Sequence, residues 1–212
     1  MDRSYYENYH ELEKNHWWHK ARIEILKDIL NSKLDKRNKI KILNVGSCTG
    51  ETSLMLNEFG TVDSLEYDYE TYKYLKTNDK INPIHGDVTR MVFKDNKYDL
   101  ICCFDVLEHI SNDNLALKEM NRCLKPKGIL FLSVPSYKFL WSDHDLKMHH
   151  FRRYNIREIK EKIKINNFKD IKSSYFNTFL FFPILLVRFL KKIVNSERSP
   201  DYLIPNKIFN VL

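Results

Sequence analysis

The sequence predicts an α/β fold in which helices cover both faces of a doubly wound, mostly parallel sheet. Three observations support this prediction. Short β-branched runs alternate with helical segments from Lys39 onward, a glycine-containing loop follows the first run, and acidic residues follow later runs. The 212 residues, 43% of them hydrophobic, suffice for one such domain with a full core. We therefore expect ligand-binding residues at the carboxyl ends of the strands.

The expected elements follow one another in a regular order. Apolar residues recur at helical spacing within residues 5–34, so we expect an N-terminal helical cap over residues 1–38 and the sheet domain over 39–212. Strands are expected at 40–45, 62–66, 81–85, 98–104, 128–134 and 168–176. Helices are expected at 52–59, 71–76, 112–124 and 155–165, a turn at 125–128, a loop at 137–154 and a helical segment at 178–212.

Charge and cysteine content exclude some classes of protein. The formal net charge is +7, from 35 Lys and Arg against 28 Asp and Glu, but the lysines are scattered, which favours a solvated surface over a nucleic-acid or membrane patch. The four cysteines (Cys48, Cys102, Cys103 and Cys123) form no C-x-x-C pair, so we expect neither a disulfide framework nor a zinc site. The first residues have no apolar core, so no signal peptide is expected, and a cytoplasmic location fits best.

The loop after the first strand is typical of a nucleotide-cofactor site. Residues 46–50 read Gly-Ser-Cys-Thr-Gly, and a glycine there lets the backbone approach a cofactor closely. Glu66 follows Gly46 by about 20 residues, where an acid is placed to accept hydrogen bonds from ribose hydroxyls. The alternative for Glu66 is a solvated strand-end glutamate. At this point a nicotinamide cofactor would fit equally well.

Three later segments distinguish between the possible cofactors. They are His85-Gly86-Asp87-Val88 after the third strand, residues 104–110 (Phe-Asp-Val-Leu-Glu-His-Ile) after the fourth, and Lys125-Pro126-Lys127-Gly128 before the fifth. Together with the glycine loop, this set resembles the class I S-adenosylmethionine-dependent methyltransferases over about residues 39–135. The resemblance implies a Rossmann-like fold. That family usually closes its sheet with a seventh, antiparallel strand, and we find no segment for it here.

The resemblance also implies a set of cofactor contacts. Gly46 and Gly50 would line the methionine part, Glu66 would hold the ribose, Asp87 and Val88 the adenine, and Phe104 the amino group; Ser47, Tyr67 and Asp105 complete the cofactor-binding set. Two residues depart from the family pattern. Asn44 stands where the family usually has Asp, and Cys48 stands where it usually has Gly, which adds a Cβ where φ is expected to be positive.

The flanking segments are similar to a bacterial and archaeal subgroup of these enzymes. His16-Trp17-Trp18 precedes Arg22, and Trp141 to His144 precedes residues 150–154 (His-Phe-Arg-Arg-Tyr). We expect Trp17 and Arg22 to lie at the cofactor, with Arg22 paired to its carboxylate. The alternative is that Trp17 and Trp18 only anchor a helix by packing.

Methyl transfer is an in-line displacement, and an oxygen or nitrogen acceptor also loses a proton. His150 and His144, in the expected acceptor-side loop over 137–154, and His109 after the fourth strand are the candidate bases. Trp141, Arg152, Arg153 and Tyr154 are the candidate substrate-binding residues. Alternatively, the two arginines pair with strand-end carboxylates and hold the loop shut. No metal is expected.

The predicted function is methyl transfer from S-adenosyl-L-methionine to a small-molecule or lipid- or glycan-linked acceptor, with S-adenosyl-L-homocysteine as product. Nucleic acid is disfavoured because no Asn-Pro-Pro-Tyr-like segment follows the fourth strand. Residues 179–192 join an apolar run to basic residues, which fits a core helix, a peripheral membrane contact or a homo-oligomer contact. The alternative function is a non-catalytic module that binds S-adenosylmethionine or S-adenosylhomocysteine and regulates or scaffolds a partner.

Overall fold

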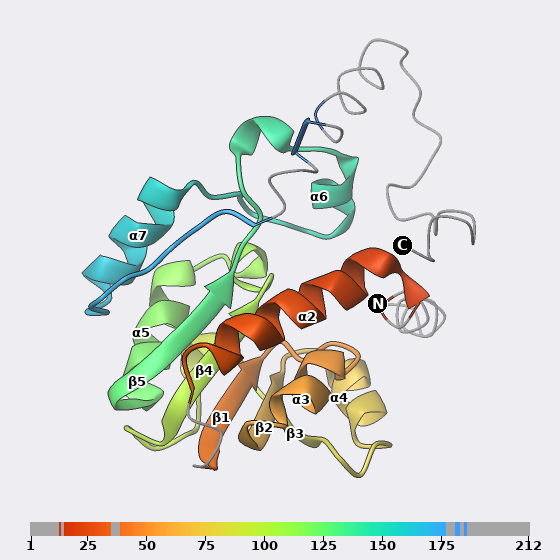
Figure 1. The fold of residues 1–212 in the computed structure, drawn as a ribbon, viewed down its shortest axis with the longest axis vertical. Coiled ribbons are helices and arrows are strands. Elements are labelled where there is room, and N and C mark those ends of the chain that lie inside the picture. Colours follow the sequence, from red (N-terminus) through yellow and green to blue (C-terminus); the bar gives the residue numbers. More distant parts are fainter. Residues whose placement is uncertain (1–12, 14, 35–38, 177–180, 183–184, 186–212) are drawn as a thin grey trace.

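The computed structural model of the chain describes residues 13, 15–34, 39–176, 181, 182 and 185. Its centre is a five-stranded sheet with the order β3-β2-β1-β4-β5, in which every neighbouring pair is parallel (Figure 1). The strands are β1 (Ile40–Val45), β2 (Gly60–Glu66), β3 (Asn82–His85), β4 (Tyr98–Phe104) and β5 (Leu124–Ser133). The predicted fold class is confirmed.

Helices connect the strands as expected for parallel pairing, because a parallel pair needs a crossover. The α-helices are α2 (Trp17–Asn31), α3 (Glu51–Leu56), α4 (Tyr69–Leu75), α5 (Asp113–Cys123), α6 (Asp143–Lys147) and α7 (Ile156–Ile165). Short 3₁₀ turns are η1 (Val88–Arg90), η2 (Leu107–His109) and η3 (Lys138–Leu140). Within the described residues, no helix is both long and apolar enough to cross a bilayer. Residues 179–192 lie almost wholly outside the described part of the chain.

Alternate residues of the buried strands face two separate cores. Ile42 and Leu100 face a core that includes Leu26 and Leu30 of α2 as well as residues of α3. Leu43 and Ile101 face the other core, which residues of α5 and α7 complete. Strand residues are therefore apolar on both faces, as expected for a parallel sheet covered by helices.

Helix α2 belongs to the packed body of the molecule. Leu26 and Leu30 are each only 3% exposed, and the helix lies across the sheet beside α3 (Figure 1). The N-terminal segment predicted as a cap thus contributes core residues from its second half. The part of the predicted helix before Glu13 lies outside the described residues.

Three predicted elements differ from the structure. Residues 168–176 form no strand. Residues 172–176 are all exposed, so the segment buries no alternating set of side chains against the sheet. The predicted turn at 125–128 lies inside β5, where the ladder shifts from Tyr98↔Leu124 to Leu100↔Ile129 and Lys127 takes a φ of 65°. The predicted loop at 137–154 contains η3 and α6, since Ser142 and Asp145 form a capping box that starts a helical turn.

Candidate active site

The order of the strands places the loops after β1 and β4 side by side. From β1 the chain adds β2 and β3 on one side of the sheet and then β4 and β5 on the other, so the strand order switches between β1 and β4. Ligands bind at such a switch point in open α/β sheets. The β1 loop uses left-handed backbone at Gly46 (φ 70°), Cys48 (φ 47°) and Gly50 (φ 94°). A Cβ on Gly46 would lie 2.4 Å from Val106 Cγ2 of the β4 loop, so only glycine fits there.

Asn44 ties the end of β1 to helix α3. Its Nδ2 donates to Thr52 Oγ1 and Ser53 Oγ, both at 2.9 Å, and its side chain is buried. Ser64 of β2 donates to the same Ser53 hydroxyl at 2.8 Å. The amide at position 44 therefore links the end of β1 to the first turn of α3.

Glu66 at the end of β2 is buried, at 9% exposure, and faces the β1 loop. Its Oε2 accepts the backbone N–H of Cys48 at 3.0 Å, and its Oε1 accepts that of Asp68 at 3.1 Å. Burial raises the pKa of Glu66, and these backbone hydrogen bonds oppose the rise. Each oxygen keeps capacity for a further donor, such as a hydroxyl.

The other expected cofactor residues lie along the same edge. Asp87 accepts the N–H and hydroxyl of Thr89 through Oδ1, Val88 is buried, and Phe104 ends β4. Tyr67 is 73% exposed just beyond Glu66. Ser47 is buried, and its hydroxyl donates to the Asn44 carbonyl at 3.3 Å.

Helix α2 brings charged side chains to this edge. Arg22 Nη2 lies 2.5 Å from Asp105 Oδ2, and Ser133 donates to Oδ1 of the same carboxylate. Glu13 accepts a hydrogen bond from the hydroxyl of Thr49 in the β1 loop, and burial raises the pKa of Glu13 to about 7 against the attraction of Arg22. Arg22 thus faces a carboxylate of the chain, and Trp17 stacks with His16 at the start of α2.

A cavity of about 420 Å³ separates α2 from the start of α3. Its lining includes Glu13, His19, Arg22, Ile23 and Glu51, so charged groups surround it beside the β1 loop. A second cavity, of about 570 Å³, lies between α3 and residues 77–81, which lead into the amino end of β3. The first cavity thus lies against α2, whereas the lining of the second includes Thr49 of the β1 loop.

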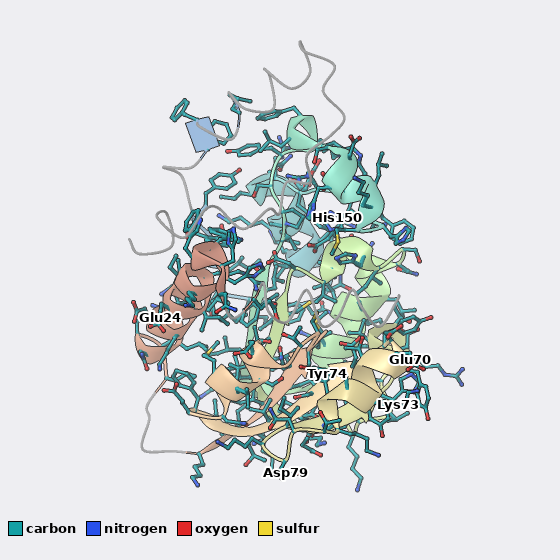
Figure 2. The ribbon with its side chains drawn as sticks, turned by 90° about the vertical axis from the view of Figure 1, so that its right-hand side faces the viewer. Glu24, Glu70, Lys73, Tyr74, Asp79 and His150 are labelled. Carbon is teal, nitrogen blue, oxygen red and sulfur yellow. The ribbon has the colours of Figure 1, made fainter. Side chains whose placement is uncertain are left out.

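Two of the candidate histidines meet beyond β4 and β5. The rings of His109 and His150 have centroids 4.5 Å apart at 86°, and His144 lies 6.2 Å from His150. Burial lowers the pKa of His109 to about 4, and His150 adds to this effect, so His109 is neutral at pH 7. His150 lies at the α6 end of the molecule, opposite Asp79 (Figure 2).

Asp145 holds His150 in place. Its Oδ1 lies 2.8 Å from His150 Nδ1, and the carboxylate also accepts Arg153 Nε at 2.7 Å and Arg153 Nη2 at 2.9 Å. Asp145 is fully buried. Burial opposes its ionisation, but the hydrogen bonds from His150 and Arg153 outweigh burial and hold the pKa of Asp145 well below its usual range.

The candidate substrate residues divide into buried and exposed ones. Arg152 pairs with Asp113 at 2.7 Å, and the Tyr154 hydroxyl donates to the same carboxylate at 2.9 Å. Arg153 and Tyr154 are buried, whereas Trp141 is 38% exposed. Both arginines pair with carboxylates of the chain, but these belong to α5 and α6 and not to strand ends, as the alternative had expected.

Comparison with known proteins identifies the domain. Residues 43–132 match the family model described as a methyltransferase domain. The chain thus resembles a methyltransferase domain over these residues and has a class I methyltransferase fold. A putative methyltransferase from Bacillus halodurans has a similar fold, with a TM-score of 0.65 at 14% identity over 86% of this chain and 87% of that one.

Two curated relatives match the methyltransferase domain and its flanks. One is an uncharacterised protein of Methanocaldococcus jannaschii, 28% identical over 73% of this chain and 65% of its own length. The other is a ubiquinone biosynthesis O-methyltransferase of Rickettsia canadensis, 28% identical over 63% of this chain and 64% of its own length. The chain thus spans less than two thirds of these relatives. The predicted resemblance to class I methyltransferases is confirmed, and the finer subgroup stays a prediction.

The edge of this methyltransferase domain fits S-adenosylmethionine, the cofactor of its family. Glu66 presents a buried carboxylate for ribose hydroxyls, and the Cα of Gly46 allows close backbone approach. Arg22 and Glu13 supply opposite charges beside the same loop, as suits a ligand with both an ammonium and a carboxylate. The roles of the individual residues stay predictions.

The sequence prediction gave no role to Glu13, Glu108 or Asp145. Glu13 contacts the β1 loop, Glu108 is buried near His109 and His150, and Asp145 anchors both His150 and Arg153. Asp145 carried a detectable signal, because it precedes a histidine and an arginine within one short segment rich in aromatic residues. The contact of Glu13 with Thr49 had no signal in the sequence, because the two residues are 36 positions apart.

Proposed function

We propose that this chain transfers a methyl group from S-adenosylmethionine to a hydroxyl oxygen of an apolar, lipid-linked or small-molecule acceptor. The observation that carries the proposal is the position of two features at one end of the sheet. The left-handed β1 loop with Glu66 lies on one side of β4, and the Asp145–His150 pair lies beyond the end of the same strand.

The chain's own residues have distinct tasks on the cofactor side. When bound, the cofactor supplies an electrophilic methyl group on a sulfonium. Glu66 accepts the ribose hydroxyls, Asp87 and Val88 face the adenine, and Gly46 and Gly50 give the methionine part room. Arg22 and Asp105, already paired at 2.5 Å, close the site from the α2 side and exclude water.

The histidine cluster supplies the group that handles the acceptor's proton. Asp145 fixes the orientation of His150, and His109 is neutral at pH 7, so the His109 ring has a lone pair available for a proton. A hydroxyl oriented by these rings becomes a better nucleophile as its proton moves away. This geometry favours an oxygen acceptor, in keeping with the relatives named O-methyltransferases.

Exposed apolar side chains around the acceptor-side segment favour an apolar acceptor. Phe139, Trp141, Leu146 and Phe151 are 64%, 38%, 60% and 59% exposed. All four belong to residues 137–154, and exposed apolar side chains that gather on a surface mark interaction sites. A lipid-linked acceptor, reached by peripheral contact with a membrane, is consistent with this surface.

The proposal is tested with the full chain, S-adenosylmethionine carrying a labelled methyl group, and three classes of acceptor. These are a prenylated phenol, its short-chain analogue and a glycolipid with a free hydroxyl. We expect product S-adenosylhomocysteine with the phenolic acceptors, abolished by Glu66→Ala. Absence of label transfer to every acceptor, with cofactor binding intact, would contradict methyl transfer to these classes.

A non-catalytic role is the second candidate, and the edge of the sheet favours it. Within the described residues no strand follows β5, and Ile129 of that strand is 39% exposed. An open edge strand pairs readily with another chain. A chain that binds S-adenosylhomocysteine, stays inactive alone and forms a stable complex with a longer homologous subunit would support regulation or scaffolding.

A further inference from the structure

Three side chains from two distant segments meet at the acceptor end of the sheet. Glu108 and His109 belong to η2, and His150 follows α6. One atom of each, a carboxylate oxygen or a ring nitrogen, lies within 4.8 Å of the other two. Two imidazoles and a carboxylate are a donor set that divalent transition metals bind.

The far side of each imidazole is already held by an acceptor. His150 Nδ1 lies 2.8 Å from Asp145 Oδ1, so Nδ1 faces this carboxylate and Nε2 is the ring nitrogen left for another partner. His109 makes a backbone hydrogen bond to Met148 on the same segment as His150. In metal sites, histidine ligands commonly donate their second N–H to a carboxylate or a backbone carbonyl, and both forms occur here.

Glu108 lacks a donor for one of its oxygens. Its side chain is 1% exposed, and within the described residues Oε2 has no hydrogen-bond partner. A buried carboxylate without a donor is costly unless it is protonated or pairs with a cation. The ring nitrogens of His109 and His150 lie within 4.8 Å of this carboxylate, so a cation held between the three side chains would supply the missing partner.

We propose that Glu108, His109 and His150 bind one divalent transition-metal ion of the zinc class, with Asp145 and Met148 orienting the two imidazoles. Three protein ligands leave at least one position open for an exogenous oxygen. Magnesium and calcium are disfavoured because they prefer oxygen ligands. On the proposed function, which this role requires, the open position holds the acceptor hydroxyl and lowers its pKa. The hydroxyl proton then leaves to solvent, and the two imidazoles act as metal ligands in place of bases.

The test measures metal binding directly, without any acceptor or cofactor. The tag-free full chain is stripped with a chelator and titrated with Zn²⁺ against a chromophoric competitor. We expect one equivalent bound by the wild type. Asp145→Asn removes an orienting partner and should weaken Zn²⁺ binding by roughly 10–100-fold. Glu108→Gln and His150→Ala each remove a ligand and should weaken Zn²⁺ binding by more than that.

The matched control is His149→Asn, which removes an exposed histidine of the same segment and keeps a residue that tolerates the φ of 56°. Far-ultraviolet circular dichroism shows that each variant folds. Zn²⁺ should raise the melting temperature of the wild type and of His149→Asn equally, and that of the other variants less. Wild-type chain that is folded but binds no Zn²⁺, or equal binding by Glu108→Gln, would overturn the proposal in favour of a protonated Glu108. Zinc binding without binding of S-adenosylhomocysteine would instead count against the proposed function.

Discussion

Several site residues adopt a left-handed backbone that their side chains disfavour. Cys48, Asp105 and His149 have φ values of 47°, 53° and 56°, and each follows or precedes a group assigned to the site. Such conformations cost on the order of 1–3 kcal/mol each and persist where the surroundings impose them. At the scale of single residues, the conformations of the strand-end loops therefore lower the stability of the folded chain.

Opposite changes at two neighbouring loop positions should therefore have opposite effects. Gly46→Ala introduces a Cβ that would lie 2.4 Å from Val106 Cγ2 at a φ of 70°, so we expect the free energy of unfolding to fall by about 2 kcal/mol or more. Cys48→Gly relieves a φ of 47°, so stability should hold or rise by up to about 1 kcal/mol. Urea unfolding of both variants measures the pair, and an equal loss in both would refute the backbone argument.

Asp145 is the residue whose loss should cost most. Asp145→Asn removes the charge that balances Arg153, which is 7% exposed. Breaking a buried pair in this way typically costs about 3–5 kcal/mol. The double variant Asp145→Asn with Arg153→Met should recover part of the loss in urea unfolding, because no uncompensated charge remains. Recovery of nothing would show that the pair itself is not the source of the stability.

At the scale of elements, the strands were predictable and the segments after β5 were not. Strands β1 and β4 match their predicted bounds because β-branched and apolar residues fill them between clear turn signals. Residues 168–176 also contain apolar and aromatic residues, yet residues 172–176 are exposed. A high β-propensity alone therefore formed no strand, because these side chains are not buried against the sheet. Helix α6 depends on a local capping box between Ser142 and Asp145, which the sequence prediction did not recognise.

Asp63 joins β2, β3 and β4 and gives the sheet a pH dependence. Its carboxylate accepts Lys97 Nζ at 2.6 Å, the Tyr98 hydroxyl at 2.7 Å and Asn82 Nδ2 at 2.8 Å. Burial opposes ionisation, but the hydrogen bonds from Lys97 and Tyr98 outweigh it and lower the pKa of Asp63. This stabilisation is present above the unfolded pKa, near about 4, and is lost as the pH falls through the lower folded pKa.

Asp63→Asn should consequently destabilise the chain by about 1–3 kcal/mol at neutral pH and by less in acid. Urea unfolding of the wild type and the variant at pH 7 and at about pH 3 measures the difference. A destabilisation that is the same at both pH values would show that the charge on Asp63 contributes nothing. Glu70→Gln, at an exposed position on α4, serves as the control.

At the scale of the whole molecule, local sequence motifs predicted the cofactor side of the site. The acceptor side depends on contacts between residues far apart in the sequence. The glycine loop and Glu66 are recognisable because chain order and spacing alone bring them to one edge. The Arg22–Asp105 pair spans 83 residues, and the meeting of Glu108 with His150 depends on how the 137–154 segment folds back. Such contacts follow from tertiary packing, which no local pattern encodes.

The central claim is that the end of this sheet binds the methyl-donor cofactor, and calorimetric titration with S-adenosylhomocysteine tests it most directly. Three chains are compared: wild type, Glu66→Ala, and Asp79→Asn at the opposite end of the molecule (Figure 2). We predict micromolar binding by the wild type and by Asp79→Asn, and loss of binding in Glu66→Ala with the fold retained. A folded wild-type chain that binds no S-adenosylhomocysteine, or Glu66→Ala that binds it equally well, would contradict the account.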